Sequence, residues 1–362
     1  MKLLVDARTG WGHGIGRVIA NMVPRVARLR PDWQVEALVQ PEQTTAARAA
    51  FADAPNLRIV PCPIAPFSFG EQTGLHRYAR GADLTWFTNY WVPLAWRTPF
   101  VAIVHDMLHL LPQYIPASPL KRALARQTFA KLRRDARVVM FVSRFTQAEF
   151  TRMIGQPRHL GETVTLGGDH LDYGEIRPMA GRTRRLLVVA ASKKHKNFAT
   201  LFEAWRQARL PGHWVLTVIS PQEFMLNSID LTTLAAGNER IDIRRSVSNG
   251  ELAALYGDSA IVLMPSLYEG FGLPLLEGML AGALCISSNA GSLVEVAQGG
   301  FVPFVNGTDL QGWIAAIEQA CAMVDSGEPD LDPLLRHNIA CARRFRWDET
   351  ARQAAALLEA AS

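Results

Sequence analysis

Residues 260–287 read AIVLMPSLYEGFGLPLLEGMLAGALCIS, and this stretch indicates the architecture of the chain. It begins with an apolar run, Ala260 to Met264, and ends with another, Ala283 to Ser287. Between them lie a glycine-containing loop and an apolar segment of helical length that begins near Pro274. A strand, a crossover helix and a second strand form the repeating unit of a parallel sheet. The stretch therefore predicts an α/β fold.

Apolar runs of the same kind occur in two series, and helix-like segments follow them. The first series comprises residues 2–6, 35–39, 84–87, 100–104 and 138–142, and the second comprises 186–190, 214–219, 241–243, 260–264 and 283–287. Between the series, residues 171–184 lack a clear period and contain Gly174, Pro178 and Gly181, which favours a linker. We therefore predict two α/β domains, over 1–172 and 183–345. The C-terminal segment, 346–362, has a helical pattern over 347–361 and is predicted to form a helix.

Composition places the chain among ordinary globular proteins. Apolar residues make up 49% and charged residues 20% of its 362 residues, which excludes disorder and fibrous repeats. No run reaches the roughly 18 apolar residues of a membrane span. Asp6 ends the first apolar run too early for a signal peptide, so we expect a cytoplasmic protein. The four cysteines have no CxxC spacing and are expected to be buried thiols.

The loop between Met264 and the helix of the opening stretch has the composition of an anion site. Pro274 suits the first position of a helix, so the amides of residues 270–273 are expected to face outward at its N-terminus. Glu269 precedes this helix and Glu277 lies in its first turns. One acidic residue there usually compensates the helix dipole. Two around a glycine loop can also hold the hydroxyls of a sugar and a ribose.

Three other loops follow predicted strands, where open parallel sheets bind ligands. Residues 6–17, DARTGWGHGIGR, precede a helix expected from about Val18 and form either a plain turn or an anion-binding loop. Residues 192–197, SKKHKN, concentrate three lysines before a helix and form either a solvated loop or a site for an anionic ligand. His105 ends another strand and is either a structural histidine or one that contacts a sugar hydroxyl.

The spacing of Glu269 and Glu277, within PSLYEGFGLPLLEG, resembles the donor-sugar motif of retaining GT-B glycosyltransferases of family four. Similar segments follow the family's order along nearly the whole chain: VDAR (5–8), GIGR (14–17), HD (105–106), VSRFTQAEF (142–150), LGGDH (166–170), HKNFATLFEAW (195–205) and SNAGSLVEV (288–296). The resemblance implies a GT-B fold, with two Rossmann-like domains whose parallel sheets face each other across a cleft. It also implies a C-terminal helix that crosses back to the N-terminal domain.

The resemblance also assigns roles to residues. The C-terminal domain would bind the nucleotide-sugar and the N-terminal domain would bind the acceptor. Glu277 would bind the ribose, Glu269 would lie near the transferred sugar, and His105 would contact a hydroxyl of that sugar. The other expected ligands of the donor are Lys196, Lys193, Gly270, Phe271, Gly272 and Leu273, and the expected acceptor or phosphate loop is Gly14, Ile15, Gly16 and Arg17.

One position departs from the family pattern. Many relatives carry an arginine a few residues before the phosphate-binding lysine, where this chain has Ala190 and Ala191. Lys193, Lys194 or Arg17 is therefore expected to supply the missing charge.

The function that follows is transfer of a hexose, with GDP-mannose as the expected donor, to a lipid-linked bacterial surface glycan. Alternatives on the same fold are a nucleotide-sugar epimerase, a phosphorylase or a non-catalytic nucleotide-sugar-binding subunit. No metal or other cofactor is expected, because the one D-x-D triplet, Asp330 to Asp332, lies outside the strand-end loops. Nucleic-acid binding is not expected, because no recognition motif accompanies the basic residues.

Residues 117–137 hold seven basic side chains and one acid, Asp135. On one continuous helix, the side chains of Arg122, Arg126, Arg133 and Arg137 would fall within an arc of about 60°. This arginine stripe is either a solvated face or a surface that docks on anionic lipid at the cytoplasmic face of the inner membrane.

Overall fold

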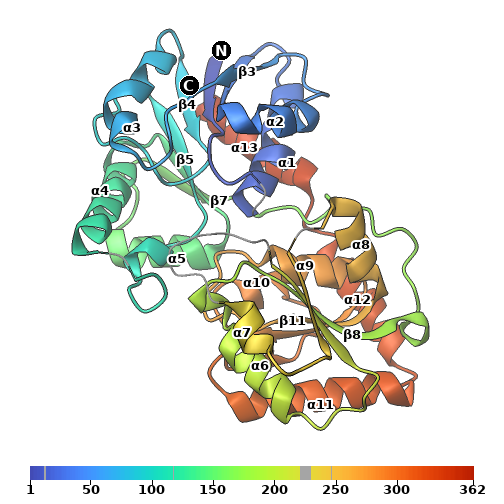
Figure 1. The fold of residues 1–362 in the computed structure, drawn as a ribbon. Helices are drawn as coiled ribbons and strands as arrows, with labels where there is room; N and C mark the ends of the chain where they lie inside the picture. The colour runs from blue at the N-terminus through green and yellow to red at the C-terminus, as the bar shows by residue number, and fades with distance from the viewer. Residues whose placement is uncertain (12–13, 117, 221–229, 246) are drawn as a thin grey trace. The chain divides into compact units, whose positions relative to one another are not determined.

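The fold is described from a computed structural model, over residues 1–11, 14–116, 118–220, 230–245 and 247–362. The chain divides into two compact units (Figure 1). Unit 1 comprises Met1–Leu111, Ala117–Gly167 and Phe345–Ser362. Unit 2 comprises Pro112–Pro116 and Gly168–Arg344.

Unit 1 is built on a parallel sheet that has seven strands in the described residues, in the order β3-β2-β1-β4-β5-β6-β7. The strands are β1 (Lys2–Asp6), β2 (Gln34–Val39), β3 (Leu57–Pro61), β4 (Leu84–Phe87), β5 (Phe100–Val104), β6 (Val138–Phe141) and β7 (Leu160–Thr163). Its α-helices are α1 (Gly14–Leu29), α2 (Thr44–Ala50), α3 (Phe69–Gly74), α4 (Pro119–Asp135), α5 (Arg144–Ile154) and α13 (Trp347–Ala360).

Unit 2 is built on a second parallel sheet, with six strands in the described residues, in the order β10-β9-β8-β11-β12-β13. The strands are β8 (Thr183–Val189), β9 (Val215–Ile219), β10 (Ile241–Arg244), β11 (Ser259–Met264), β12 (Leu284–Ser288) and β13 (Phe304–Val305). The α-helices are α6 (Phe198–Gln207), α7 (Leu231–Ala235), α8 (Asn249–Asp258), α9 (Leu273–Leu280), α10 (Leu293–Val296), α11 (Leu310–Ser326) and α12 (Leu331–Ala342).

The central strands of both sheets are buried along their whole length, as a parallel sheet covered by helices on both faces requires. Their side chains contribute to a buried apolar cluster in each unit. The prediction of an α/β fold with two parallel sheets is confirmed. In each sheet the strand order reverses beside the first strand of the unit, between β1 and β4 and between β8 and β11. Loops at such a reversal are where open α/β sheets bind ligands.

The C-terminal helix α13 belongs to unit 1, where it packs beside α1 (Figure 1). Arg25 on α1 pairs with Asp348 at 3.0 Å, and Arg30 pairs with Glu359 at 2.5 Å. Trp347 at the start of α13 is fully buried. The last helix of the chain therefore contributes to the core of the unit that contains the first.

All four cysteines are free thiols, and Cys62, Cys285 and Cys321 are buried. Burial raises the pKa of Cys285 to about 12, so its thiol stays protonated at neutral pH. Among the helices of the described residues, none combines the length and the apolar character that crossing a membrane requires.

Candidate functional site

The strand reversal of unit 2 brings together two of the loops singled out in the sequence. The loop after β8 leads into a 3-10 turn over Lys194–Lys196, and the loop after β11 leads to the N-terminus of α9. The backbone N–H of Leu267 donates to the carbonyl of His195 at 2.7 Å, which joins the two loops. The Asn197 amide donates to the carbonyl of Pro265 at 3.1 Å and strengthens this contact.

Lys196 and Glu269 form an ion pair across these loops. The Lys196 Nζ lies 2.5 Å from the Glu269 Oε1, which also accepts from the Ser266 hydroxyl at 2.7 Å. The two side chains are 16% and 11% exposed. Lys196 and Glu269, which were both expected at the donor, therefore contact each other directly and keep part of their side chains exposed to solvent.

A loop after β12 fixes the backbone that carries Glu269. Ser292 donates its hydroxyl to the carbonyl of Phe271 at 2.8 Å, and its N–H donates to the carbonyl of Glu269 at 3.2 Å. Gly291 has φ +63°, and a β-carbon there would lie 2.3 Å from the Glu269 carbonyl oxygen. Glycine is required at this position for both reasons. The sequence analysis assigned no role to Ser266, Asn197 or Ser292, although each follows a strand at this edge of the sheet.

The helix α9 begins one residue earlier than Pro274 suggested, at Leu273. Gly272 caps it with φ +100°, which only glycine adopts readily. In the part of the chain that is described, the backbone N–H groups of Gly272 and Leu273 have no hydrogen-bond acceptor in the protein. Gly270, Phe271, Gly272 and Leu273 are nevertheless buried as residues. The structure thus supplies two unpaired amides and a helix dipole a few residues after Glu269, the partner of Lys196.

Glu277 lies deeper in the unit than the sequence analysis expected. Its side chain is fully buried (0% exposed), on a helix that is apolar almost all round. One carboxylate oxygen accepts from the Tyr256 hydroxyl at 2.6 Å, and the other lies 3.2 Å from the His170 Nε2. Both oxygens therefore have partners inside the protein, and Glu277 ties the helices α8 and α9 to the segment that contains His170.

The lysines before α6 differ in exposure. Lys194 is exposed and Lys193 is partly exposed. Burial, Lys196 and Lys193 together lower the pKa of the buried His195 to about 2. The charges of Lys193 and Lys196 therefore both act on His195, and this imidazole is neutral at physiological pH. Of the residues named for the missing charge, Lys193 lies in unit 2 together with Lys196, and Arg17 lies in unit 1.

The expected loop at Gly14, Ile15, Gly16 and Arg17 is corrected by the structure, because these residues form the first turn of α1. The helix had been expected from about Val18; residues 12 and 13 lie outside the described part. Gly16 approaches the preceding segment closely: its N–H donates to the Gly10 carbonyl at 2.8 Å, and a β-carbon would lie 2.3 Å from that oxygen. Close packing therefore explains the glycine at position 16.

His105 follows β5 in unit 1 and is partly buried. Its Nε2 lies 2.8 Å from the Thr88 carbonyl oxygen, so this nitrogen carries the proton and donates it. Burial lowers the pKa of His105, although the Thr88 carbonyl and Asp106 act in the opposite direction. The side chain is a neutral imidazole with one ring nitrogen engaged by the protein.

Unit 1 contains a buried charged cluster that sequence analysis did not predict, the Arg8 network of Asp6, Arg8 and Glu71. Arg8 forms two bonds of 2.8 Å to the carboxylate of Asp6 and a further ion pair with Glu71. Burial alone would lower the pKa of Arg8, but Asp6 and Glu71 raise it above its usual value. Because Arg8 and Glu71 are 63 positions apart, no local pattern could have signalled their contact.

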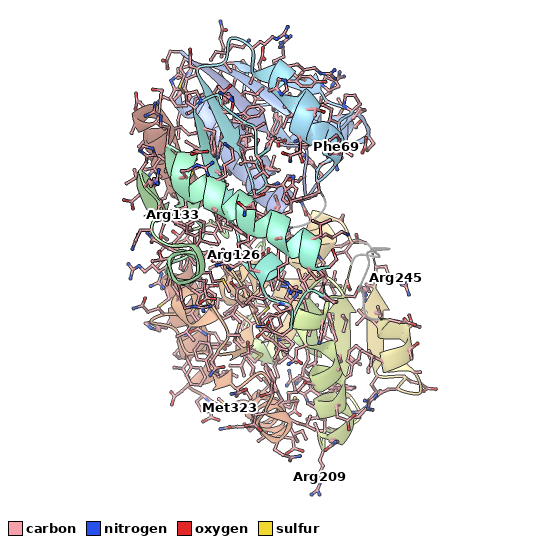
Figure 2. The ribbon with its side chains drawn as sticks, turned by 90° about the vertical axis from the view of Figure 1, so that its left-hand side faces the viewer. Phe69, Arg126, Arg133, Arg209, Arg245 and Met323 are labelled. Carbon is pink, nitrogen blue, oxygen red and sulfur yellow. The ribbon has the colours of Figure 1, made fainter. Side chains whose placement is uncertain are left out.

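The arginine stripe is shorter than predicted. The helix α4 ends at Asp135, and Arg137 lies just before the next strand, β6, so it is not on the helix. Arg133 donates to the carbonyl of Gln156 at 3.2 Å, whereas Arg126 is exposed (Figure 2). Arg122 is partly exposed. The expected core side of the helix is buried at Ala125, Thr128, Phe129 and Leu132.

Within the described residues, no cluster of three or more His, Cys, Asp or Glu side chains could hold a metal ion. In the D-x-D triplet, Asp332 accepts from the backbone N–H of Met179 at 3.0 Å. The carboxylate of Asp332 therefore holds the backbone of the segment before β8.

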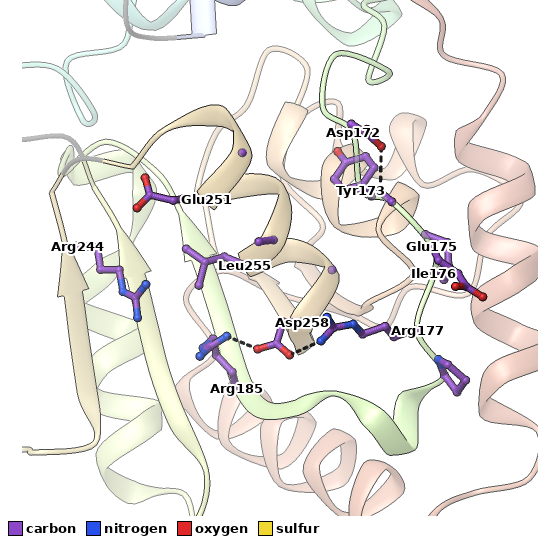
Figure 3. A pocket seen from close by; sticks show the side chains of 15 residues that line it. Asp172, Tyr173, Glu175, Ile176, Arg177, Arg185, Arg244, Glu251, Leu255 and Asp258 are labelled. Atoms are coloured by element: carbon purple, nitrogen blue, oxygen red, sulfur yellow. Dashed lines mark hydrogen bonds and ion pairs between the residues drawn. The ribbon is translucent and has the colours of Figure 1, made fainter.

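A separate pocket of unit 2 contains none of the predicted site residues (Figure 3). It is an open hollow of about 1040 Å³ between residues 172–178 and the helix α8. Asp258 on its wall pairs with Arg177 at 3.2 Å and with Arg185 at 2.9 Å. Basic and acidic side chains thus offset each other there, and the pocket has no excess positive charge for a diphosphate.

Comparison with known proteins finds a family match within unit 2. Residues 183–323 match the family described as Glycosyl transferases group 1. The match lies within unit 2 and covers less than half of the chain. The serotype-specific mannosyltransferase WbdA of Escherichia coli is 26% identical over 275 residues, which cover 71% of this chain and 32% of that protein. The GDP-mannose:cellobiosyl-diphosphopolyprenol alpha-mannosyltransferase of Komagataeibacter xylinus is 27% identical over 56% of this chain and 52% of that protein.

Solved structures show the same fold over nearly the whole chain. Sucrose-phosphate synthase from Thermosynechococcus elongatus has a TM-score of 0.78 at 16% identity and covers 99% of this chain and 98% of that one. Anabaena HepE, solved with UDP-glucose, has a TM-score of 0.77 at 15% identity, with 99% of both chains covered. These neighbours identify the GT-B fold. The chain spans about a third of the length of the first curated relatives that it matches.

Proposed function

We propose that this chain transfers a hexose from a nucleotide-sugar to a hydroxyl group of a growing glycan, with retention of the anomeric configuration. The observation that carries the proposal is the contact of Lys196 with Glu269 beside the unpaired amides of Gly272 and Leu273. It lies at the strand reversal of the unit that matches the glycosyltransferase family.

The chemistry of glycosyl transfer fits these groups. Breaking the bond from the sugar to the phosphate builds negative charge on the departing diphosphate. Lys196 and the amides at the start of α9 would offset this charge, and Lys193 would supply the second cation in place of the missing arginine. Donor binding would exchange the Lys196–Glu269 pair for a Lys196–phosphate pair, which frees the Glu269 carboxylate to accept from sugar hydroxyls.

The proposed reaction uses no carboxylate nucleophile. Retaining glycosidases attack the anomeric carbon with a carboxylate. Here Glu277 is buried with both oxygens engaged, and Glu269 is bonded to Lys196 and Ser266. We therefore propose attack by the acceptor on the same face from which the diphosphate leaves, with the leaving phosphate taking the acceptor proton. His105 and the ribose contact of Glu277 remain assignments from the family resemblance.

GDP-mannose is the proposed donor and a lipid-linked bacterial glycan the proposed acceptor. The relatives named as mannosyltransferases support the sugar. The Komagataeibacter protein is named for GDP-mannose and for a diphosphopolyprenol-linked acceptor, which supports the nucleotide and the lipid carrier. A lipid-linked acceptor would bring the chain to the cytoplasmic face of the inner membrane.

A thermal-shift panel of GDP-mannose, UDP-glucose, ADP-glucose and dTDP-glucose tests the donor. A bound donor at 100 times its Kd stabilises the folded chain by about 2.7 kcal/mol. We expect GDP-mannose to raise the Tm of the unaltered chain and of Lys194→Met, an exposed lysine of the same turn, but not of Lys196→Met. A panel without any shift, or an equal shift in all three proteins, would contradict the proposed site.

The transfer is proposed to need no divalent metal, because the cationic side chain and the amides take the place of the ion at the diphosphate. The expected result is full activity in excess chelator. Activity that disappears with chelator and returns with Mg²⁺ or Mn²⁺ would refute metal independence.

A further inference from the structure

The segment 265–269, here called the Glu269 loop, connects β11 to the carboxylate at the candidate site. Ser266 holds this loop at both of its oxygens. Its carbonyl accepts from the Ser288 hydroxyl at the end of β12, and its own hydroxyl donates to the Glu269 Oε1 at 2.7 Å. The position of the loop backbone therefore determines where the Glu269 carboxylate can meet a ligand.

Leu267, the next residue, has both of its backbone polar groups bonded by segments that are distant in the chain. Its N–H donates to the carbonyl of His195 at 2.7 Å, and its carbonyl accepts from the Tyr114 hydroxyl at 3.2 Å. The ring of Tyr114 also packs on that of Tyr268, with centroids 5.8 Å apart. Tyr114 therefore contacts two consecutive residues of the Glu269 loop, one through its hydroxyl and one through its ring.

Tyr114 comes from the first half of the chain, 153 positions before Leu267. It lies at the centre of Pro112–Pro116, which belongs to unit 2, whereas the described residues on either side belong to unit 1. A proline fixes its own φ and restricts the residue before it to extended conformations. The segment between the two prolines is therefore stiff, and it loses little conformational entropy when it holds Tyr114 in one place.

The segment that carries Tyr114 contributes little to the core of unit 2. Pro112, Gln113 and Pro116 are exposed, and Tyr114 is partly exposed. Tyr268, in contrast, is 5% exposed. Because so little of the segment is buried, we expect the contacts of Tyr114 to act mainly on the geometry of the Glu269 loop and less on overall stability.

This geometry concerns the sugar of a bound donor more than its diphosphate. The groups proposed for the diphosphate, Lys196 and the amides at the start of α9, lie outside the Glu269 loop, whereas the carboxylate proposed for the sugar hydroxyls lies at its end. A polar group that is already in place before binding gives higher affinity than one that binding must first order. The contacts of Tyr114 should therefore affect the sugar-dependent part of the affinity.

We infer that Tyr114 is a positioning residue of the donor site. Its hydroxyl on the Leu267 carbonyl and its ring on Tyr268 hold Glu269 where the carboxylate meets the hydroxyls of the transferred sugar. The inference rests on the proposed function, because that function assigns the sugar to Glu269. It adds to the site a side chain from outside residues 183–323, the range that matches the family.

Calorimetric titration of the full chain with GDP and with GDP-mannose tests this role. Tyr114→Phe removes the hydroxyl and keeps the ring, and its affinity for GDP-mannose should fall about fivefold, as for the loss of one hydrogen bond. Tyr114→Ala removes both contacts and should lower that affinity about tenfold or more. The affinity for GDP, which has no sugar, should stay the same in both variants, and this result also shows that the altered site is folded.

The matched control is Tyr78→Phe, which removes the hydroxyl of a partly exposed tyrosine in unit 1. This variant should bind both nucleotides like the unaltered chain. A second readout needs no ligand. Amide hydrogen exchange of residues 266–269 should be faster in Tyr114→Phe than in Tyr78→Phe, because the loop has lost one of its bonds.

Equal losses of affinity for GDP and GDP-mannose in Tyr114→Phe would make Tyr114 a structural residue and would overturn the inference. Unchanged affinity for both nucleotides, or an unchanged exchange rate in the Glu269 loop, would overturn it as well. An unaltered chain that binds neither nucleotide would contradict the proposed function. The assignment of Tyr114 to the sugar would then fall with that function, while hydrogen exchange would still decide whether Tyr114 holds the loop.

Discussion

The two sheets differ at the same topological position. At the reversal of unit 1, Asp6 ends β1 and Arg8 follows it, and together with Glu71 they form a network that is closed to solvent. At the reversal of unit 2, Lys196 and Glu269 keep part of their side chains exposed. A buried ion network has no charge available for a ligand, whereas a partly exposed pair at a helix N-terminus can exchange one partner for an anion. The comparison teaches that exposure, more than the presence of charges, distinguishes a structural network from a ligand site.

The largest expected effect is a loss of stability when the Arg8 network is broken. Arg8→Met would leave two buried carboxylates without their cation and should lower the free energy of unfolding by about 3–5 kcal/mol. Urea unfolding measures this change. Arg58→Met is the control, because Arg58 forms an exposed pair with Glu36 and its loss should cost less than about 1 kcal/mol. Equal stability of the two variants would show that the Arg8 network is not structural.

The next effect concerns activity. Lys196→Met should slow transfer about 100- to 1000-fold, by analogy with the loss of a group that stabilises transition-state charge. Its free energy of unfolding should fall less than that of Arg8→Met, because Lys196 and Glu269 are 16% and 11% exposed and Glu269 keeps its hydrogen bond from Ser266. Rates with saturating donor, together with urea unfolding, separate the two quantities. Lys194→Met should retain the normal rate, and a Lys196→Met enzyme that does so too would exclude Lys196 from the reaction.

A smaller effect tests whether Glu277 only stabilises the fold or also binds the ribose of the donor. Tyr256→Phe removes one hydrogen bond from the buried carboxylate and should cost about 1–3 kcal/mol of unfolding free energy. Calorimetric titration with GDP and 2′-deoxy-GDP supplies the second readout. If Glu277 turns to bind the ribose, Tyr256→Phe should change the affinity for GDP but not for 2′-deoxy-GDP. An equal change for both nucleotides would assign Glu277 to the structural class.

The smallest expected effect is a pH dependence at the ligand site. His195 has a pKa of about 2 in the folded chain against 6.5 ordinarily. Below pH 6.5 the unfolded chain therefore binds a proton that the folded chain does not, so stability falls as the pH falls through this window. Between about pH 6.5 and about pH 5.5 the loss should be about 1 kcal/mol.

His195→Gln should flatten that slope in urea unfolding at several pH values. A residual slope is expected from His105, whose pKa is shifted in the same direction. An unchanged slope in the variant would mean that the pKa of His195 is the same in the folded and the unfolded chain.

The buried strands could be predicted from the sequence, because continuous apolar runs mark strands covered on both faces. The predictions missed β3 and β7, in which every residue is partly or fully exposed, and β13, which has two residues. Edge strands of this kind have little apolar signal. The arginine stripe failed at Arg137 because the arc assumed that the helix continued past Asp135, where the backbone instead becomes extended at Ala136.

The candidate site could be predicted in part. Lys196 and Glu269 were both expected at the donor, and strand order explains why they meet, since β8 and β11 are neighbours. The burial of Glu277 had a signal that was overlooked: it lies among leucines and methionine on a helix without a polar face, and such a helix is buried all round. The Arg8 network had no sequence signal, because Arg8 and Glu71 lie far apart along the chain.

The most direct test of the proposed donor site is a crystal structure of the full chain with bound GDP-mannose. We predict that the diphosphate lies within hydrogen-bond distance of the Lys196 Nζ and of the amides of Gly272 and Leu273, with the Lys196–Glu269 pair broken. A diphosphate bound elsewhere, such as in the hollow beside α8, with that pair intact, would contradict the account.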